Sequence, residues 1–94
     1  MSKKIVPSYI DVRTCVEFEA KHAKGSVNIP MHDVLEEFEY FKNLPKPIIV
    51  FCRTGNRSGW VADLFREKGI DQIYNGGSVE DIGELGFEII FGEN

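Results

Sequence analysis

The segment Ile48-Ile49-Val50-Phe51 constrains the fold most, because it is apolar at every position. A strand with one face in water alternates apolar and polar residues, whereas a continuous apolar run is typical of a strand covered on both faces. Pro47 precedes the run, and a polar stretch follows it after Cys52. We therefore predict a buried central strand over 48–51, with further strands beside it and helices on both faces.

Short apolar runs and helical patterns alternate along the rest of the chain. The runs predict strands over 9–12, 26–30 and 73–74 and an apolar tail over 87–91. The helical patterns predict helices over 14–21, from 33 to the prolines at 45 and 47, over 58–68, and a last turn from 78. This alternation favours an α/β domain built on an open sheet of mainly parallel strands.

Polar residues at the predicted helix ends support these assignments. Capping boxes are predicted at Thr14 with Glu17, at Asp33 with Glu36, and at Ser78 with Asp81, and Gly69 is placed as a C-terminal cap. Two helices are also expected to turn apolar faces to the core. Those faces comprise Val34, Leu35, Phe38 and Phe41 in one helix, and Trp60, Val61, Leu64 and Phe65 in the other.

Composition narrows the possible classes of protein. Ninety-four residues, 43% of them hydrophobic, suit one domain over 1–94. A net charge of −4 argues against a general nucleic-acid binder, and the longest apolar run, Ile48 to Cys52, is too short for a membrane span. The basic start Met1–Lys4 is followed by an apolar run that breaks at Pro7 and Asp11, so we expect no signal peptide and a cytoplasmic location. We also expect a monomer.

The two cysteines, Cys15 and Cys52, lie far apart and form no CxxC pair. His22 and His32 fall near neither of them, so no zinc ligand set is recognisable and we expect no metal. We expect both histidines to be surface or loop residues. In a reducing compartment a structural disulfide is disfavoured, so each cysteine is either a buried apolar residue or a reactive thiol.

The segment Cys52-Arg53-Thr54-Gly55-Asn56-Arg57-Ser58 carries the chemistry. The central strand delivers Cys52 to the carboxyl edge of the sheet, where ligands bind in open α/β folds, and a helix follows about six residues later. Backbone N–H groups of the loop, the helix dipole and two arginines favour an anion there, and Gly55 allows the backbone to curl. We therefore predict that Cys52 is an activated thiolate rather than a buried apolar filler.

Three stretches together resemble the rhodanese-like sulfurtransferases of the single-domain type. The first is Ile10-Asp11-Val12-Arg13 with Glu17-Phe18 and the segment 22–30, the second is the cysteine loop, and the third is Tyr74-Asn75-Gly76-Gly77. The resemblance runs from about Tyr9 to Phe91. The chain departs from the family pattern at Cys15, at Lys21 and after Gly77, where a tryptophan is usual. The last of these departures does not touch the cysteine loop.

The resemblance implies an open, mainly parallel sheet with helices on both faces and a two-step sulfur transfer without a cofactor. Cys52 takes sulfane sulfur from a small anionic donor such as thiosulfate, and the persulfide passes it to cyanide or a thiol, including a protein thiol. The expected substrate-binding residues are those of the loop after the catalytic cysteine, namely Arg53, Thr54, Gly55, Asn56, Arg57 and Ser58. Asp11 and Arg13 are expected to brace the site, and His22 to hold a neighbouring loop.

Two alternatives remain beside a sulfurtransferase of small donors. One is a persulfide relay or binding module that acts on a protein partner, since the sequence names neither donor nor acceptor. The other is a protein phosphatase, whose loop also places a cysteine before a helix. That loop has five residues between its cysteine and arginine, whereas only four separate Cys52 from Arg57 here. The shorter loop suits a persulfide sulfur better than a tetrahedral phosphate.

Overall fold

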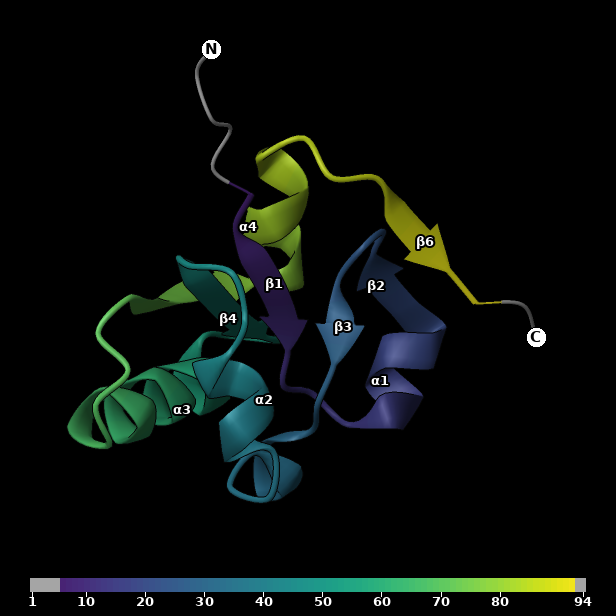
Figure 1. Cartoon of the computed structure of the whole chain (residues 1–94). Helices are drawn as coiled ribbons and strands as arrows, with labels where there is room; N and C mark the ends of the chain where they lie inside the picture. The colour runs from purple at the N-terminus through teal and green to yellow at the C-terminus, as the bar shows by residue number, and fades with distance from the viewer. Residues whose placement is uncertain (1–5, 93–94) are drawn as a thin grey trace, which may run out of the picture.

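The computed structural model describes residues 6–92 of the chain (Figure 1). The expected absence of a signal peptide was based partly on the start Met1–Lys4, and this segment lies outside the described residues. No helix within residues 6–92 is both long and apolar enough to cross a membrane.

A four-stranded sheet forms the centre of the molecule, with the strand order β3-β1-β4-β5. Its strands are β1 (Ser8–Asp11), β3 (Val27–Asn28), β4 (Ile48–Cys52) and β5 (Ile73–Ser78), and every neighbouring pair is parallel. β4 lies between β1 and β5, with Asp11 opposite Phe51 and Ile48 opposite Ile73. The apolar run at 48–51 thus forms an interior strand, as predicted.

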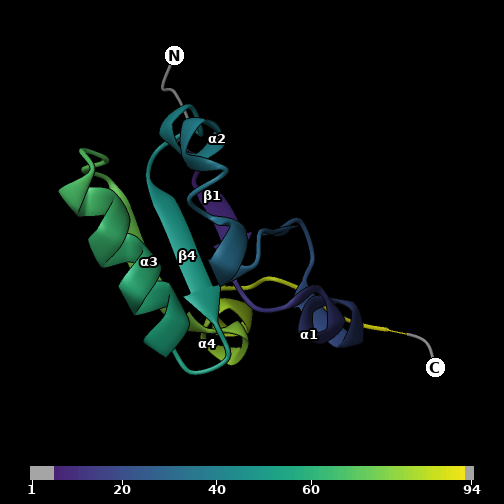
Figure 2. The same ribbon diagram turned by 90° about the horizontal axis from the view of Figure 1, so that it is seen from below.

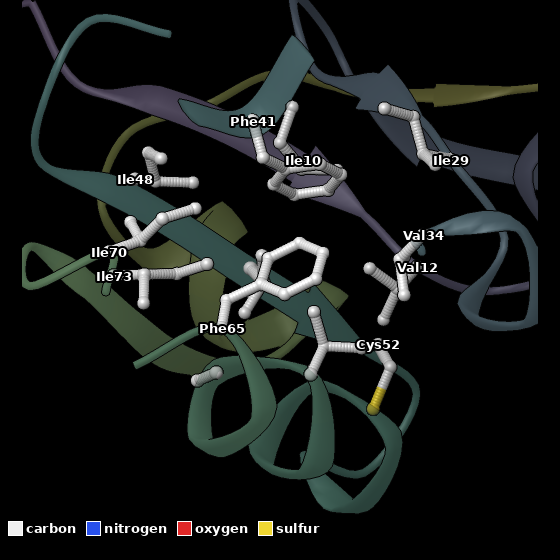
Figure 3. Close-up of a cluster of buried hydrophobic side chains, with 13 residues drawn as sticks. Ile10, Val12, Ile29, Val34, Phe41, Ile48, Cys52, Phe65, Ile70 and Ile73 are labelled. Atoms are coloured by element: carbon white, nitrogen blue, oxygen red, sulfur yellow. The ribbon is translucent and has the colours of Figure 1, made fainter. Parts of the chain in front are cut away.

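Alternate residues of β4 enter two separate apolar clusters, because successive side chains of a strand point to opposite faces. Ile48, Val50 and Cys52 belong to the larger cluster, shown in Figure 3, together with residues of α2 (Phe38–Lys42) and α3 (Asn56–Glu67). Ile49 and Phe51 pack with Val79 and Ile82 of α4 (Val79–Glu84) on the other face. The predicted α/β architecture with helices on both faces is confirmed, and Figure 2 shows α3 alongside β4.

A second, two-stranded sheet was not predicted. β2 (Lys21–Ala23) pairs antiparallel with β6 (Ile89–Phe91), the apolar tail of the sequence analysis. β2 follows directly on α1 (Cys15–Ala20). In Figure 1 this small sheet and α1 lie beside the β3 edge of the main sheet.

Two of the three predicted capping boxes are present. The Thr14 hydroxyl accepts from the Glu17 N–H, and the Glu17 carboxylate accepts in return from the Thr14 N–H. Ser78 and Asp81 make the same reciprocal pair at the start of α4. Gly69 has a φ of 103°, as expected for a glycine after the end of α3.

The third capping box is wrong. Met31–Asp33 form a 3-10 helix, η1, and residues 34–37 continue as tight turns with bonds such as Glu36 N–H to the Asp33 carbonyl. α2 therefore starts only at Phe38, and Leu35 is exposed instead of buried. Val34 and Phe41 are buried as predicted.

α3 differs from the prediction in its start and in one face residue. It begins at Asn56, two residues before the predicted start, because Gly55 adopts a left-handed conformation and takes the N-cap position. Val61 and Phe65, four residues apart, face the core. Trp60 lies beside that stripe rather than on it and is half-exposed.

Candidate active site

Cys52 is the last residue of β4, and α3 starts four residues later. The loop between them therefore lies at the carboxyl edge of the sheet, where β1 and β5 also end on either side of β4. Cys52 is fully buried and is a free thiol. In Figure 3 its sulfur lies at one end of the apolar cluster, near Val12 and Val34.

The sulfur of Cys52 receives hydrogen bonds from the loop and from α3. The Gly55 N–H donates to Sγ at 3.0 Å, and the Ser58 hydroxyl lies 3.4 Å from Sγ. Burial raises the pKa of the Cys52 thiol, because a charge is disfavoured away from water. The bonds from the Ser58 side chain and from backbone groups of Ser58, Thr54 and Gly55 more than offset burial, so the net pKa is below the ordinary thiol value.

Gly55 gives the loop its curled shape. Its φ of 96° lies in the left-handed region, which glycine enters without the steric penalty of a side chain. A Cβ atom there would also lie 3.4 Å from the Cα of Gly77. Asn56 adds to the curl through its backbone N–H, which lies 3.4 Å from the Thr54 hydroxyl.

Asn75 of β5 fastens this loop from the neighbouring strand. Its Nδ2 donates to the Gly55 carbonyl at 2.9 Å, and its Oδ1 accepts from Ser58 at 2.6 Å. The sequence placed Asn75 only in a turn motif. In the structure Asn75 lies within β5, opposite Val50 of β4. The signal that could have identified it is its place directly after the predicted strand at 73–74, because the carboxyl ends of parallel strands share one edge.

The guanidinium of Arg57 is paired with a carboxylate. Both terminal nitrogens donate to the two carboxylate oxygens of Glu17 in α1, at 2.8 and 3.1 Å. The hydrogen bond from Arg57 is the largest cause that lowers the pKa of Glu17 to about 2. The same bond is the largest cause that raises the pKa of Arg57, with a smaller contribution from Cys52. The expectation that Arg57 binds the donor therefore stays a prediction that requires this ion pair to open.

A buried ion pair lies next to the cysteine loop, and its arginine lines the cleft beside that loop. Arg13 Nη2 lies 2.7 Å from Asp11 Oδ2 and also donates to the Lys21 carbonyl, which joins β1 to β2. Asn28 Nδ2 donates to the carbonyls of Asp11 and Arg13, each at 3.0 Å. These contacts are of the bracing kind that the resemblance implied.

The two histidines lie outside the cysteine loop. His22 Nδ1 lies 2.9 Å from the Phe18 carbonyl oxygen, and its ring stacks on the Phe18 ring. These contacts hold the junction between α1 and β2. The His32 side chain is exposed. Within residues 6–92 no group of three or more His, Cys, Asp or Glu side chains could hold a metal ion.

A cleft of about 500 Å³ opens next to the loop. It is lined by the loop, by β1 and α1, by β2 and by the start of α4, through the residues Arg13, Glu17, Ala20, Lys21, Arg53, Thr54, Val79 and Glu80. Glu17 and the Lys21–Glu80 ion pair are lining groups that the sequence did not indicate.

Arg53 differs from the other cations around the cleft. Arg13 pairs with Asp11, and Lys21 pairs with Glu80. Arg53 is exposed and, within the described part of the chain, has no carboxylate within 4.0 Å. Its charge is therefore available to an anion that enters the cleft.

The geometry assigns different positions to the predicted site residues. Gly55 and Ser58 converge on the sulfur of Cys52, and Arg53 and Thr54 line the cleft. Asn56 contributes its backbone to the loop, and Arg57 is held by Glu17. Together these groups can stabilise a thiolate and receive an anion beside it, which is the requirement for nucleophilic attack by sulfur.

Comparison with known proteins agrees with this geometry. Residues 1–81 match the family model described as "Rhodanese-like domain". The thiosulfate sulfurtransferase PspE of Escherichia coli is 29% identical over 75 residues, which cover 79% of this chain and 72% of that protein. The uncharacterized protein YqhL of Bacillus subtilis is 36% identical over 66 residues, covering 70% of this chain and 52% of that protein.

A solved structure also superposes on almost the whole chain. It is titled a rhodanese with anions from E. coli and has a TM-score of 0.76 and 27% sequence identity. The alignment covers 93% of this chain and 100% of that one.

Proposed function

Since this chain belongs to the rhodanese-like domain family of sulfurtransferases, we propose that it transfers sulfane sulfur from a small anionic donor such as thiosulfate, through a persulfide on Cys52. The observation that carries the proposal is the environment of Sγ, which receives hydrogen bonds from Gly55 and Ser58 that lower the pKa of the thiol. A thiolate is the attacking species in such exchange reactions.

The proposed reaction has two balanced steps. The Cys52 thiolate attacks the outer sulfur of thiosulfate, an S–S bond forms at Sγ, the S–S bond of thiosulfate breaks, and sulfite leaves with the electron pair. Cyanide or a thiolate then attacks the terminal sulfur of the persulfide. Thiocyanate or a new persulfide leaves, and the Cys52 thiolate is regenerated.

Two features support a small donor. Cys52 has no exposed surface, so a donor has to reach its sulfur through the loop, where Arg53 and Thr54 line the cleft. Arg53 carries a charge without a carboxylate partner among residues 6–92, which suits a dianion. In this proposal Arg53, Thr54, Asn56 and Arg57 receive the donor, while the Gly55 N–H and the Ser58 hydroxyl stabilise the sulfur anion.

The test is a thiosulfate-to-cyanide assay combined with intact mass measurement. With thiosulfate alone, the chain is expected to gain the mass of one sulfur atom, and cyanide should remove it as thiocyanate. Cys52→Ser should lose both properties while keeping the fold, because a serine hydroxyl is similar in size and stays protonated at neutral pH. Cys15→Ala is the matched control and should keep both.

The assay also separates the proposal from the relay alternative. A persulfide on Cys52 that forms only when a protein persulfide is supplied would contradict the small-donor proposal and favour a relay. Substantial thiocyanate formation by Cys52→Ser would contradict the assignment of the sulfur carrier.

A further inference from the structure

Asn75 connects three segments around the cysteine loop. Its Nδ2 donates to the Gly55 carbonyl in the loop at 2.9 Å. Its Oδ1 accepts from the Ser58 hydroxyl in α3 at 2.6 Å and from the Gly77 N–H at 3.0 Å. Asn75 itself does not contact the sulfur, so any influence on Cys52 has to pass through these partners.

These bonds also fix the orientation of the Asn75 amide. If the amide were flipped, its NH₂ group would face the Gly77 N–H, and its oxygen would face the Gly55 carbonyl. Both contacts would then be repulsive, since two donors would meet at one end and two acceptors at the other. The carbonyl oxygen of Asn75 is therefore the atom that faces Ser58.

The Ser58 hydroxyl has one proton and two acceptors within reach. Sγ of Cys52 lies 3.4 Å from Oγ, and Oδ1 of Asn75 lies 2.6 Å from it. A hydroxyl donates only one hydrogen bond at a time. Ser58 has no exposed surface, so water does not reach it as a third acceptor. The two acceptors therefore compete for one proton.

The charge of the sulfur decides that competition. A neutral thiol is a weak acceptor, whereas a thiolate accepts a charge-assisted hydrogen bond. The amide oxygen of Asn75 is intermediate, and it keeps the Gly77 N–H as a donor when Ser58 turns away. We propose that Asn75 is a positioning residue that holds the Ser58 proton while Cys52 is neutral and yields it to the sulfur when Cys52 becomes a thiolate. The inference rests on the proposed role of Cys52 and adds Asn75 to its machinery.

The competition has a definite consequence for Ser58. In the parent protein, ionisation of Cys52 gains a Ser58 bond to the thiolate but loses the Ser58 bond to Asn75. Without an acceptor at position 75, ionisation gains the Ser58 bond to the thiolate and loses no other Ser58 bond. With a carboxylate at position 75, ionisation loses a stronger Ser58 bond than the one to Asn75. The effect of Ser58→Ala on the Cys52 pKa should therefore be largest beside Asn75→Leu, intermediate in the parent, and smallest beside Asn75→Asp.

The experiment measures that pKa from the pH dependence of the alkylation rate with iodoacetamide. All proteins carry Cys15→Ala, so that Cys52 is the single thiol. Ser58→Ala is compared with its parent in three backgrounds, namely unchanged, Asn75→Leu and Asn75→Asp. Effects of Asn75 on the loop or on local charge cancel, because they are the same on both sides of each comparison. Arg57 of α3 interacts electrostatically with Cys52, and Glu17 of α1 and Asp11 of β1 act in turn on Arg57. These three charged groups are unchanged in all the proteins compared.

We expect Ser58→Ala to raise the pKa by about half a unit in the parent and by about one unit beside Asn75→Leu, as suits a hydrogen bond to a charged group. Beside Asn75→Asp the shift should be near zero. Equal shifts in the three backgrounds would overturn the proposal, as would a smaller shift beside Asn75→Leu than in the parent, which is the result expected if Asn75 only keeps Ser58 in place. If Asn75→Leu does not fold, as judged by circular dichroism, the comparison with Asn75→Asp decides alone.

This measurement is independent of sulfur transfer. The expected series without thiocyanate formation would support the role of Asn75 and contradict the proposed function. Thiocyanate formation together with equal Ser58→Ala shifts in the three backgrounds would support the proposed function and contradict the role of Asn75.

Discussion

Glu17 and Arg57 form the contact in the site that differs most from what the sequence suggests. An arginine in a cysteine loop is expected to offer its planar donors to an anionic substrate. In the structure those donors are occupied by the carboxylate of Glu17, which reaches them from α1. Arg57 can therefore bind a donor only in exchange for Glu17, whereas Arg53 needs no such exchange.

This exchange predicts opposite effects for the two partners. Glu17→Gln should lower the KM for thiosulfate about threefold, because the Arg57 fork is freed at the cost of a partly exposed ion pair worth about 0.5–1 kcal/mol. Arg57→Ala should raise KM by a similar factor, and Arg57→Lys should restore only part, since the charge returns without the fork. Steady-state kinetics with cyanide as acceptor measures the KM for thiosulfate of each variant. Glu88→Gln, which frees Lys24 outside the cleft lining, is the control. An unchanged KM in both Glu17→Gln and Arg57→Ala would show that the pair serves structure alone.

The same ion pair predicts a component of acid stability. The folded pKa of Glu17, about 2, lies below its ordinary value of 4.5, so the charged carboxylate is favoured by folding. This contribution is complete above about pH 4.5 and is lost as the pH falls from there toward 2. Because the pair is partly exposed, it amounts to no more than about 1 kcal/mol. Urea unfolding at pH 7 and pH 3 should show that Glu17→Gln destabilises the chain at pH 7 and less so at pH 3. A destabilisation of equal size at both pH values would contradict the assignment.

At the scale of elements, α1 and α4 are too short to be stable by themselves, at six residues each. Their capping boxes are therefore expected to matter. Thr14→Ala and Ser78→Ala should each cost about 1 kcal/mol, which corresponds to a fall in Tm of about 4–8 °C for a domain of this size. Thr14→Ser keeps the cap and should retain the parent Tm, as measured by circular dichroism. A Thr14→Ala protein with the parent Tm would mean that α1 is held by its tertiary contacts instead.

The features that were predicted correctly depend on residues close together in the sequence, whereas those that were missed depend on distant segments. The apolar run at 48–51, the caps at Thr14 and Ser78 and the glycine at 69 act through neighbouring residues, and all four were predicted correctly. β2 and β6 were missed because each has only three residues and pairs with a segment far away in the chain. The Glu17–Arg57 and Asn75–Ser58 contacts were missed for the same reason, since no periodicity encodes a contact between distant segments.

At the scale of the whole molecule, the cleft is assembled from segments of the entire chain. Arg13 and Glu17 come from the first quarter, Arg53 and Thr54 from the middle, and Glu80 from α4. The parallel order β1-β4-β5 brings the ends of these strands to one edge, and α1 lines the cleft together with the loop. The cysteine strand could be recognised from local sequence, but the shape of the cleft depends on this assembly.

The assembly also bears on the two thiols. β1, the strand that precedes Cys15 in the chain, pairs directly with β4, which carries Cys52. Neighbouring strands are one condition for a disulfide between the two cysteines. A disulfide also requires Cα atoms within about 7 Å of each other. Cys15 is exposed at the first residue of α1, whereas Cys52 is buried beneath its loop, and Figures 1 and 2 both show α1 apart from the end of β4. We therefore expect that Cys15 does not attack an oxidised Cys52 to form an internal disulfide.

Mild peroxide treatment tests that expectation for the chain as a whole. Peroxide converts an accessible thiolate to a sulfenic acid, which a nearby thiol would capture as a disulfide. Non-reducing peptide mapping should show no peptide that joins Cys15 to Cys52, and Cys15→Ala should keep the full rate of thiocyanate formation. A crosslinked peptide in high yield, absent from the Cys15→Ala control, would mean that α1 approaches the loop in solution. Oxidation would then block the sulfur carrier reversibly, and Cys15 would place the transfer reaction under redox control.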